Sequence, residues 1–329
     1  MSSYQEFYEE AARAFSFDGS GKIIHRFGNI KSIPAAKQGN EQWVNAVEEV
    51  AWPVLYRWHY LRDRRRIPDR REGLTIRERE DAEFVARLSE ANHSAGVLDA
   101  GWRVLARGCG ECLCEKSGVR LRVSMAALQA DGMRAEDEIV AVRFPGERRY
   151  WMPAYYCTAA GTACEPELRI YFNVKPESAP WLLGVLSREL QDAAASYQLK
   201  LLNHPQSYTR PDAAVLYVPS SHARLCRGLV DQLLAEEGSR LRSAIPALAR
   251  RIYPGIAVAD EPPLLRGRRA SFGEHRCRAL ARGLARAHRE GTRSIGRAVD
   301  AICGELVLGN TDPACPYANL SGRSAAADF

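Results

Sequence analysis

Two of the few lysines in this chain lie in a stretch that also carries arginines at strand-like spacing. The sequence has six lysines against 40 arginines, and Lys175 and Lys200 both fall between Arg169 and Arg210. A lysine amine can lose its proton near neutral pH when its surroundings disfavour the charge, whereas an arginine guanidinium cannot. The stretch therefore indicates a sheet that displays a site with a group able to lose its proton; the alternative is that composition bias leaves a few lysines anywhere in the chain.

The same stretch alternates as β-strands do, which decides which side chains share a face. In residues 169–175, successive side chains point in opposite directions, so the apolar ones face one side and the polar ones the other. The polar face carries Arg169, Tyr171, Asn173 and Lys175. A helix after Ser178 and strands over 197–201 and 212–218 follow, which gives a β-α-β-β unit. The alternative is a solvent-exposed sheet face, the commoner situation in antiparallel sheets.

Further polar residues could join such a site from neighbouring segments. His204 and Arg210 lie in the loop that follows the strand of Lys200. Arg269 precedes Ser271, where a capping-box pattern predicts the start of a helix. Cations beside a helix N-terminus favour the binding of an anion there. The alternatives are a surface histidine and a capped helix with solvated arginines.

Periodicity predicts helices in the first quarter of the chain and strands after it. The predicted helices cover residues 4–15, residues 41–62 with a break at Pro53, and a segment from the capping box Thr75-x-x-Glu78 to about Asn92. The predicted strands cover residues 102–107, 111–116, 119–123 and 138–144, with a tight turn at Ser117-Gly118. These strands form an antiparallel meander.

The last third returns to helical periodicity. Helices are predicted over 221–236, more weakly up to Tyr253, and again from Ser271, with a loop over 257–269. The patterns together predict an α+β fold, with a mixed, mainly antiparallel sheet flanked by helices and with helical N-terminal and C-terminal regions. We expect a mainly helical region over 1–100, an α+β core over 101–310 and an irregular tail over 311–329.

Composition predicts a folded protein of the cytoplasm. The chain has 329 residues, 46% hydrophobic and 26% charged, and no apolar run approaches the roughly 18 residues of a membrane span. Its acidic first residues lack the apolar core of an export signal. The net charge of +6 and the basic clusters at 62–71 and 266–269 allow an anionic partner. No nucleic-acid-binding motif and no membrane partner are predicted.

The spacing of the cysteines allows a zinc site but does not favour one. Nine cysteines, an odd number without framework spacing, suit a reducing compartment. Cys109, Cys112 and Cys114 would need a fourth zinc ligand, for which Cys157 and Cys164 are the candidates. Cys112 and Cys114 share a strand face, which suits core filling as well. We therefore expect neither a metal ion nor another cofactor.

Several of these pieces, in this order, resemble the HopA-type type III effector family of plant-pathogenic bacteria. They span residues 45–290 and centre on Arg169-x-Tyr-x-Asn173, the strand Lys200 and Tyr208-x-Arg-x-Asp-Ala-Ala-Val-Leu-Tyr217. The outer pieces are Leu55-Tyr56, Leu88-x-x-Ala91-Asn92, Gly101-Trp102, the region of Pro145 and Tyr156, and Ser271-Phe-Gly-x-x-Arg276. Relatives in class V lanthipeptide and thioamitide clusters act as phosphoserine/phosphothreonine lyases beside an aminoglycoside-phosphotransferase-like kinase.

This resemblance implies a carbon–oxygen lyase that needs no metal and whose lyase-like core is residues 101–310. Its substrate would be a phosphorylated precursor peptide, converted to dehydroalanine or dehydrobutyrine during peptide maturation. The implied catalytic residues are Lys200 as the base, His204 as an acid, and Asn173 and Tyr171. The implied phosphate- and substrate-binding residues are Arg169, Lys175, Arg210, Arg269 and Arg276, with Lys175 as the alternative base. Two alternatives are a non-catalytic, precursor-binding partner of the kinase and an effector that acts on a host phosphoprotein.

Overall fold

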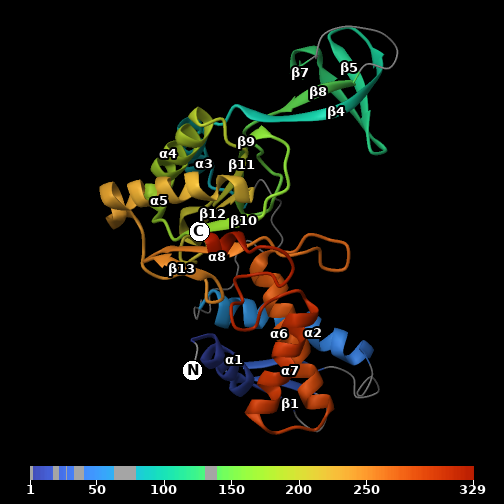
Figure 1. The fold of residues 1–329 in the computed structure, drawn as a ribbon, viewed down its shortest axis with the longest axis vertical. Helices are drawn as coiled ribbons and strands as arrows, with labels where there is room; N and C mark the ends of the chain where they lie inside the picture. Colours follow the sequence, from blue (N-terminus) through green and yellow to red (C-terminus); the bar gives the residue numbers. More distant parts are fainter. Residues whose placement is uncertain (1–2, 18–21, 27, 33–40, 63–78, 130–138) are drawn as a thin grey trace.

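A long, mixed and mainly antiparallel sheet with helices on both faces organises the protein, as the sequence predicts (Figure 1). The computed structural model describes residues 3–17, 22–26, 28–32, 41–62, 79–129 and 139–329. The strand order is β13-β14-β10-β12-β11-β9-β4-β5-β6, and among the described strands only the β4–β9 pair is parallel. The strands that carry the predicted site are β9 (Tyr155–Thr162), β10 (Leu168–Phe172), β11 (Tyr197–Leu202) and β12 (Ala214–Val218).

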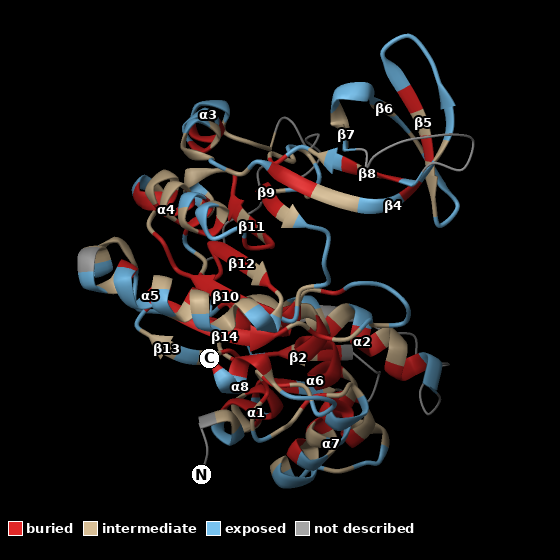
Figure 2. Cartoon of the chain, turned by 45° about the horizontal axis from the view of Figure 1, so that its top comes forward, coloured by how far each residue is buried: buried red, intermediate tan, exposed pale blue. Residues whose placement is uncertain are grey.

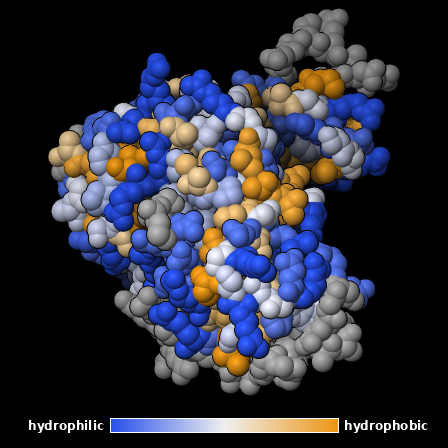
Figure 3. All heavy atoms as spheres, turned by 60° about the horizontal axis from the view of Figure 1, so that its bottom comes forward, coloured by the Kyte–Doolittle hydropathy of each residue, from blue (hydrophilic) through white to orange (hydrophobic). Residues whose placement is uncertain are grey.

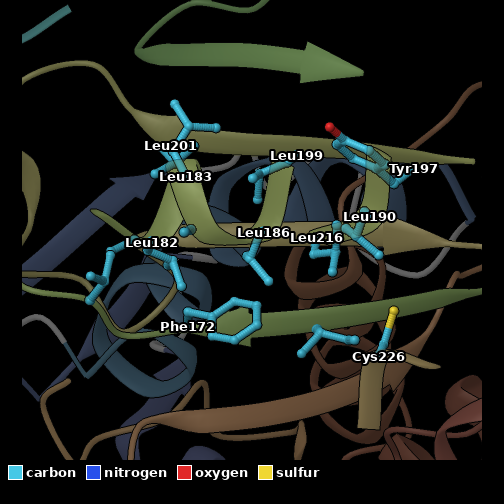
Figure 4. Packing of buried hydrophobic residues seen from close by; sticks show 14 of the residues in the cluster. Phe172, Leu182, Leu183, Leu186, Leu190, Tyr197, Leu199, Leu201, Leu216 and Cys226 are labelled. Atoms are coloured by element: carbon cyan, nitrogen blue, oxygen red, sulfur yellow. The ribbon is translucent and has the colours of Figure 1, made fainter. Parts of the chain in front are cut away.

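The two faces of the sheet are covered by different sets of helices. Helices α3 (Ala82–Ala91), α4 (Ala179–Asp192) and α5 (Ala223–Glu237) cover one face. Leucines of α4 pack there against Phe172 and Leu216 of the sheet (Figure 4). Helices α1 (Ser3–Ala14), α2 (Glu41–Leu55), α6 (Phe272–Arg289) and α7 (Ile295–Leu308) belong to the core on the other face, together with Tyr171 and Val215.

Helices cover both faces of the sheet, so the alternative interpretation, in which the polar face of the strand at 169–175 is exposed to solvent, does not hold. Every residue of β10 is buried, and the strand lies between β12 and β14 (Ile256–Asp260) (Figure 2). Arg169 and Tyr171 therefore sit on a polar face that points into the protein interior. Buried charges require partners, because an isolated charge in a low-dielectric interior is costly.

The strands β4 (Gly96–Arg107), β5 (Glu111–Lys116), β6 (Val119–Ser124), β7 (Leu128–Gln129) and β8 (Ile139–Phe144) form a projecting lobe (Figure 1). The predicted turn is confirmed, because Ser117 and Gly118 both have positive φ, at 51° and 78°, as a tight hairpin turn requires. Cys112 and Cys114 are buried in the small core of this lobe, with their sulfurs 3.7 Å apart. Within the described residues, no His, Cys, Asp or Glu cluster is arranged to hold a metal ion.

The N-terminal region follows the predicted helices and adds a small sheet. Helix α1 is confirmed, and α2 contains Pro53 and continues into a π-helical turn, η2 (Tyr56–Tyr60). The predicted capping box at Thr75 lies outside the described residues, and α3 is instead capped by Asp81, which accepts from the Phe84 amide at 2.8 Å. The strands β1 (Phe15–Phe17), β2 (Lys22–His25) and β3 (Gly28–Ser32) were not predicted.

In the last third, two predictions are wrong. The weak helix predicted up to Tyr253 ends in the strand β13 (Arg250–Tyr253), and the loop predicted from residue 257 overlaps β14. The five residues of β14 are all buried, so they lack the alternation that reveals a half-exposed strand. The tail packs beside β14, where Asp260 accepts from the backbone amides of Asn319 and Ala326, and it contains the short helix α8 (Ala325–Asp328). No described helix has the length and apolar character to cross a membrane.

A close contact between α6 and α7 gives a stability prediction. A Cβ added at Gly283 would lie 2.4 Å from the Ile302 Cα, whereas one added at Gly304, an exposed position on α7, would meet nothing within 4 Å. We expect Gly283→Ala to lower the free energy of unfolding by about 1–3 kcal/mol through overpacking. Gly304→Ala should raise it by about 0.5–1 kcal/mol through helix propensity. Denaturant unfolding measures both, and equal stabilities would contradict the predicted contact.

Candidate functional site

A cavity of about 590 Å³ lies between the polar face of the sheet and the helices α2 and α6. Strands β9 to β12 supply its floor, and the π-helical turn η2 and the first turn of α6 supply its walls. The charged side chains that line it are Lys200, Arg169, Arg210, Asp212, Glu261, Arg269 and Glu274. The cavity therefore combines enclosure by aromatic walls with a group of charges at its base.

Lys200 stands at the base of this cavity without a polar partner. Its Nζ lies 4.7 Å from the ring centroid of Tyr155 and 5.3 Å from that of Tyr217, and it makes no hydrogen bond or ion pair with the residues that the structure describes. Burial lowers the pKa of Lys200 and the nearby charge of Arg169 lowers it further, while Tyr155 and Asp212 offset part of the shift. Lys200 therefore loses its proton more readily than an exposed lysine does.

Arg169 is held by a carboxylate from the segment after β14. Its Nη2 donates to Glu261 Oε1 at 2.7 Å and its Nε donates to Oε2 of the same group, in a two-point pair. The guanidinium also lies 5.0 Å from the ring centroid of Tyr217, and only 5% of the side chain is exposed. Arg169 is therefore fixed in position and already neutralised.

Arg210 is held in the same way by Asp212. Its Nε and Nη2 donate to the two carboxylate oxygens at 2.8 and 2.7 Å, and Nη2 also contacts the hydroxyls of Tyr56 and Tyr155, each at 3.1 Å. Burial alone would raise the pKa of Asp212, but Arg210 lowers it below its usual value. Breaking one half of a buried pair of this kind costs about 3–5 kcal/mol, so the pair is a fixed part of the cavity.

The cavity is rich in tyrosine hydroxyls. They belong to Tyr56, Tyr60, Tyr155, Tyr171 and Tyr217. Burial raises the pKa of all five, so each hydroxyl remains protonated at neutral pH. Protonated hydroxyls in an enclosed space can donate hydrogen bonds to an anionic ligand or give a proton to a leaving group.

The structure brings five of the nine predicted site residues into this cavity. They are Lys200, Tyr171, Arg169, Arg210 and Arg269. Arg269 lies at the exposed rim, where it pairs with Glu165. The predicted cap at the adjacent helix start is present, because Ser271 Oγ accepts from the Glu274 amide at 3.1 Å.

The other four predicted residues lie outside the cavity lining. Strand β10 ends at Phe172, so the alternation does not continue to Asn173, which donates to the Ala244 carbonyl, or to Lys175, which donates to the Ser239 carbonyl, each at 2.8 Å. His204 accepts from the Gln206 amide at 3.3 Å and starts a short turn. Arg276 is fully buried and donates to the Pro316 carbonyl at 2.9 Å.

Sequence reasoning missed the residues that reach the cavity from distant segments. Tyr56 and Trp52 come from the end of α2 and its π-helical continuation, Trp151 from the loop before β9, and Glu261 from the end of β14. The Trp- and Tyr-rich composition of the 41–62 segment was a signal for an aromatic wall. Glu261 had no such signal, because β14 was not recognised as a strand.

This geometry defines the class of the protein. It is an α+β protein with a cavity lined by Lys, Arg and Tyr side chains on the polar face of its sheet. The model of the HopA1 effector protein family matches residues 154–318, about half of the chain. The chain therefore belongs to this family. The matched segment runs from β9 into the tail and contains Lys200, Arg169, Arg210, Asp212 and Glu261.

Two solved structures of effector proteins are similar to this chain. One, from Pseudomonas syringae pv. tomato strain DC3000, has 14% identity and a TM-score of 0.47, with 84% of this chain and 95% of that chain covered. The other, from Pseudomonas syringae pv. syringae strain 61, has 11% identity and a TM-score of 0.41, with 96% of each chain covered. No curated protein sequence matches the chain.

The buried pair beside the cavity wall gives a prediction for acid stability. Arg276 Nη1 donates to His275 Nδ1 at 2.9 Å, so the imidazole is neutral in the folded protein. Burial and the charge of Arg276 lower the pKa of His275 to about 3. Between that value and the unfolded value of about 6.5, the unfolded chain binds the extra proton, so stability falls as the pH falls. Each pH unit should cost about 1.4 kcal/mol from this group.

Urea unfolding of the wild type and of His275→Gln at a series of pH values measures this term. The variant should lose stability less steeply than the wild type between pH 6.5 and about 3. Parallel curves would show that His275 titrates normally in the folded protein.

Proposed function

We propose that the protein eliminates phosphate from phosphoserine or phosphothreonine in a peptide. The observation that carries the proposal is Lys200, a half-buried amine with a lowered pKa and no polar partner among the described residues, at the base of a cavity whose buried arginines are already paired. Removal of a weakly acidic α-proton needs a neutral base of this kind.

The reaction balances with the groups in the cavity. Lys200 takes the Cα proton, and the electrons of that C–H bond form the Cα–Cβ double bond. The Cβ–O bond breaks, and its electron pair leaves on the phosphate oxygen. Tyr155 gives that oxygen a proton, after which proton transfer from the Lys200 ammonium restores the tyrosine. The products are a dehydroalanine or dehydrobutyrine residue and hydrogen phosphate.

The position of Tyr155 supports its role as the acid in place of His204. Its ring lies beside the Lys200 amine, and its hydroxyl oxygen accepts from Arg210 at 3.1 Å, which leaves its own proton to donate. Burial raises the pKa of Tyr155, and the charge of Arg210 offsets part of this rise. A charge-assisted hydrogen bond to the tyrosine oxygen stabilises the phenolate that forms during proton transfer.

The first turn of α6 and the arginines provide places for the phosphate. Phe272, Gly273 and Ser271 line the cavity at the positive end of an 18-residue helix, where backbone N–H groups favour anions. Arg269 at the rim adds a guanidinium that is paired only at the surface. Arg169 and Arg210, fixed by their carboxylates, present oriented N–H groups without adding net charge.

The biological setting that we propose is peptide maturation in lanthipeptide or thioamitide biosynthesis. A separate aminoglycoside-phosphotransferase-like kinase would phosphorylate the precursor peptide, and this chain would then eliminate the phosphate. A second candidate is a non-catalytic protein that binds the precursor for the kinase, since the same arginine- and lysine-lined cavity would hold a phosphorylated peptide. An effector that acts on a host phosphoprotein would use the same chemistry on another substrate.

Mass spectrometry of a phosphoserine peptide incubated with the purified protein separates these functions. Elimination removes the mass of phosphoric acid and leaves a residue that adds thiols. Phosphatase activity would remove only the mass of metaphosphate and regenerate serine. Binding with no change in mass, on a peptide that is already phosphorylated, would overturn the proposed lyase in favour of the binding protein.

Three lysine variants test the base. Lys200→Ala and Lys200→Arg should each lower kcat by about 100-fold or more, because neither side chain can accept the proton at neutral pH. Lys175→Ala is the matched control, since Lys175 lies outside the cavity and bonds a backbone carbonyl. It should retain full activity. Full activity of Lys200→Ala would exclude Lys200 as the base.

The pH dependence gives an independent check on the same assignment. The neutral amine is the reactive form, so kcat/KM should rise with pH through the pKa of Lys200 in the free enzyme. Because burial lowers that pKa, the rise should come at lower pH than for an exposed lysine. A rate that falls over this range would contradict the assignment.

A further inference from the structure

A second cavity of about 620 Å³ adjoins the first and has no role in the chemistry above. It lies where the projecting lobe meets the body, lined by residues of β4, β8, β9 and the segment between β8 and β9. Trp151 and Gln198 line both cavities, so the two spaces are neighbours across these side chains. Exposed apolar side chains gather between the lobe and the body on the face shown in Figure 3.

Arg148 is the unpaired cation of this second cavity. It makes no ion pair or side-chain hydrogen bond with the described part of the chain, and its backbone amide is fixed by the Cys157 carbonyl at 2.8 Å. Its guanidinium lies 5.2 Å from the ring centroid of Trp151. Burial lowers the pKa of Arg148, which reflects an environment with little solvent to stabilise its charge.

The neighbouring charges of the second cavity have partners of their own, except that one buried oxygen of Glu147 lacks a hydrogen bond while the other accepts from the Ser89 hydroxyl at 2.7 Å. Arg149 binds Glu80 at 2.6 Å and lies 3.9 Å from Glu147. Asp99 accepts from Lys116 at 2.5 Å. Arg148 is thus left with donors that face the cavity and no carboxylate of its own.

We infer that the second cavity binds an anionic side chain of the peptide, a carboxylate or a second phosphate, next to the residue that reacts at Lys200. Arg148 would hold the anion by a charge-assisted, two-point hydrogen bond, and Trp151 would support the peptide between the two cavities. The inference rests on the proposed function in one respect, because the ligand is taken to be a peptide whose phosphorylated residue occupies the first cavity.

The test is a binding cycle on the non-reacting Lys200→Ala background. Each fluorescein-labelled peptide has a central phosphoserine and one variable residue, which is glutamate, a second phosphoserine or glutamine. The variable residue is moved one position at a time along either side of the central phosphoserine. Their Kd values are measured by anisotropy with Arg148 present and with Arg148→Gln. The control is Arg143→Gln, which removes an exposed arginine of β8 that lines neither cavity.

At one spacing, an anionic residue should tighten binding roughly tenfold over glutamine, and Arg148→Gln should abolish that preference. Arg143→Gln should preserve it. The larger effect of glutamate or of phosphoserine identifies the natural anion.

Three results would overturn the inference: no preference at any spacing, a preference that survives Arg148→Gln, or an equal weakening of every peptide by Arg148→Gln. Thermal unfolding of each variant shows whether an equal weakening comes from misfolding of Arg148→Gln. If Arg148→Gln is misfolded, Trp151→Ala is measured in its place as the second variant. Phosphate release by the otherwise unchanged protein is scored separately. Its absence together with an Arg148-dependent preference would reject the lyase and keep the anion site.

Discussion

The candidate site depends on the pairing of charges buried beneath the sheet. Arg169 pairs with Glu261, and Arg210 pairs with Asp212, each through two hydrogen bonds. Both pairs lie on the polar face of the sheet or next to it. Each pair satisfies a buried guanidinium that would otherwise disfavour folding. The same pairing leaves Lys200 as the cavity amine without a polar partner in the described residues, and burial lowers its pKa. The chemistry that we propose follows from this contrast.

Local patterns predicted the parts of the site that alternation and capping control. Arg169, Tyr171 and Lys200 follow from period-two patterns, and Ser271 follows from its capping box. The hairpin at Ser117-Gly118 and the α+β class also follow from such patterns. Each of these features is fixed by residues near one another in sequence, which is why the sequence reveals them.

Long-range contacts decided the remaining features and were not accessible from one sequence. Alternation placed Asn173 and Lys175 in the site, but the strand ends at Phe172 and both side chains bond to backbone carbonyls instead. Arg276 is held by the C-terminal tail through the Pro316 carbonyl. The aromatic wall from α2 and the partner Glu261 are brought in by packing across the sheet, and the fully buried strand β14 lacks the alternation that would have revealed it.

The protonation state of Lys200 decides whether this side chain can act as the base, and NMR can observe it directly. With six lysines in the chain, selective labelling with ¹³C at the lysine Cε gives a spectrum in which the Lys200 signal is assigned by its loss in Lys200→Ala. We predict that this signal titrates below the ordinary lysine pKa of about 10.4. A Lys200 signal that titrates at or above the ordinary value would show an amine that is charged at neutral pH and would exclude Lys200 as the base.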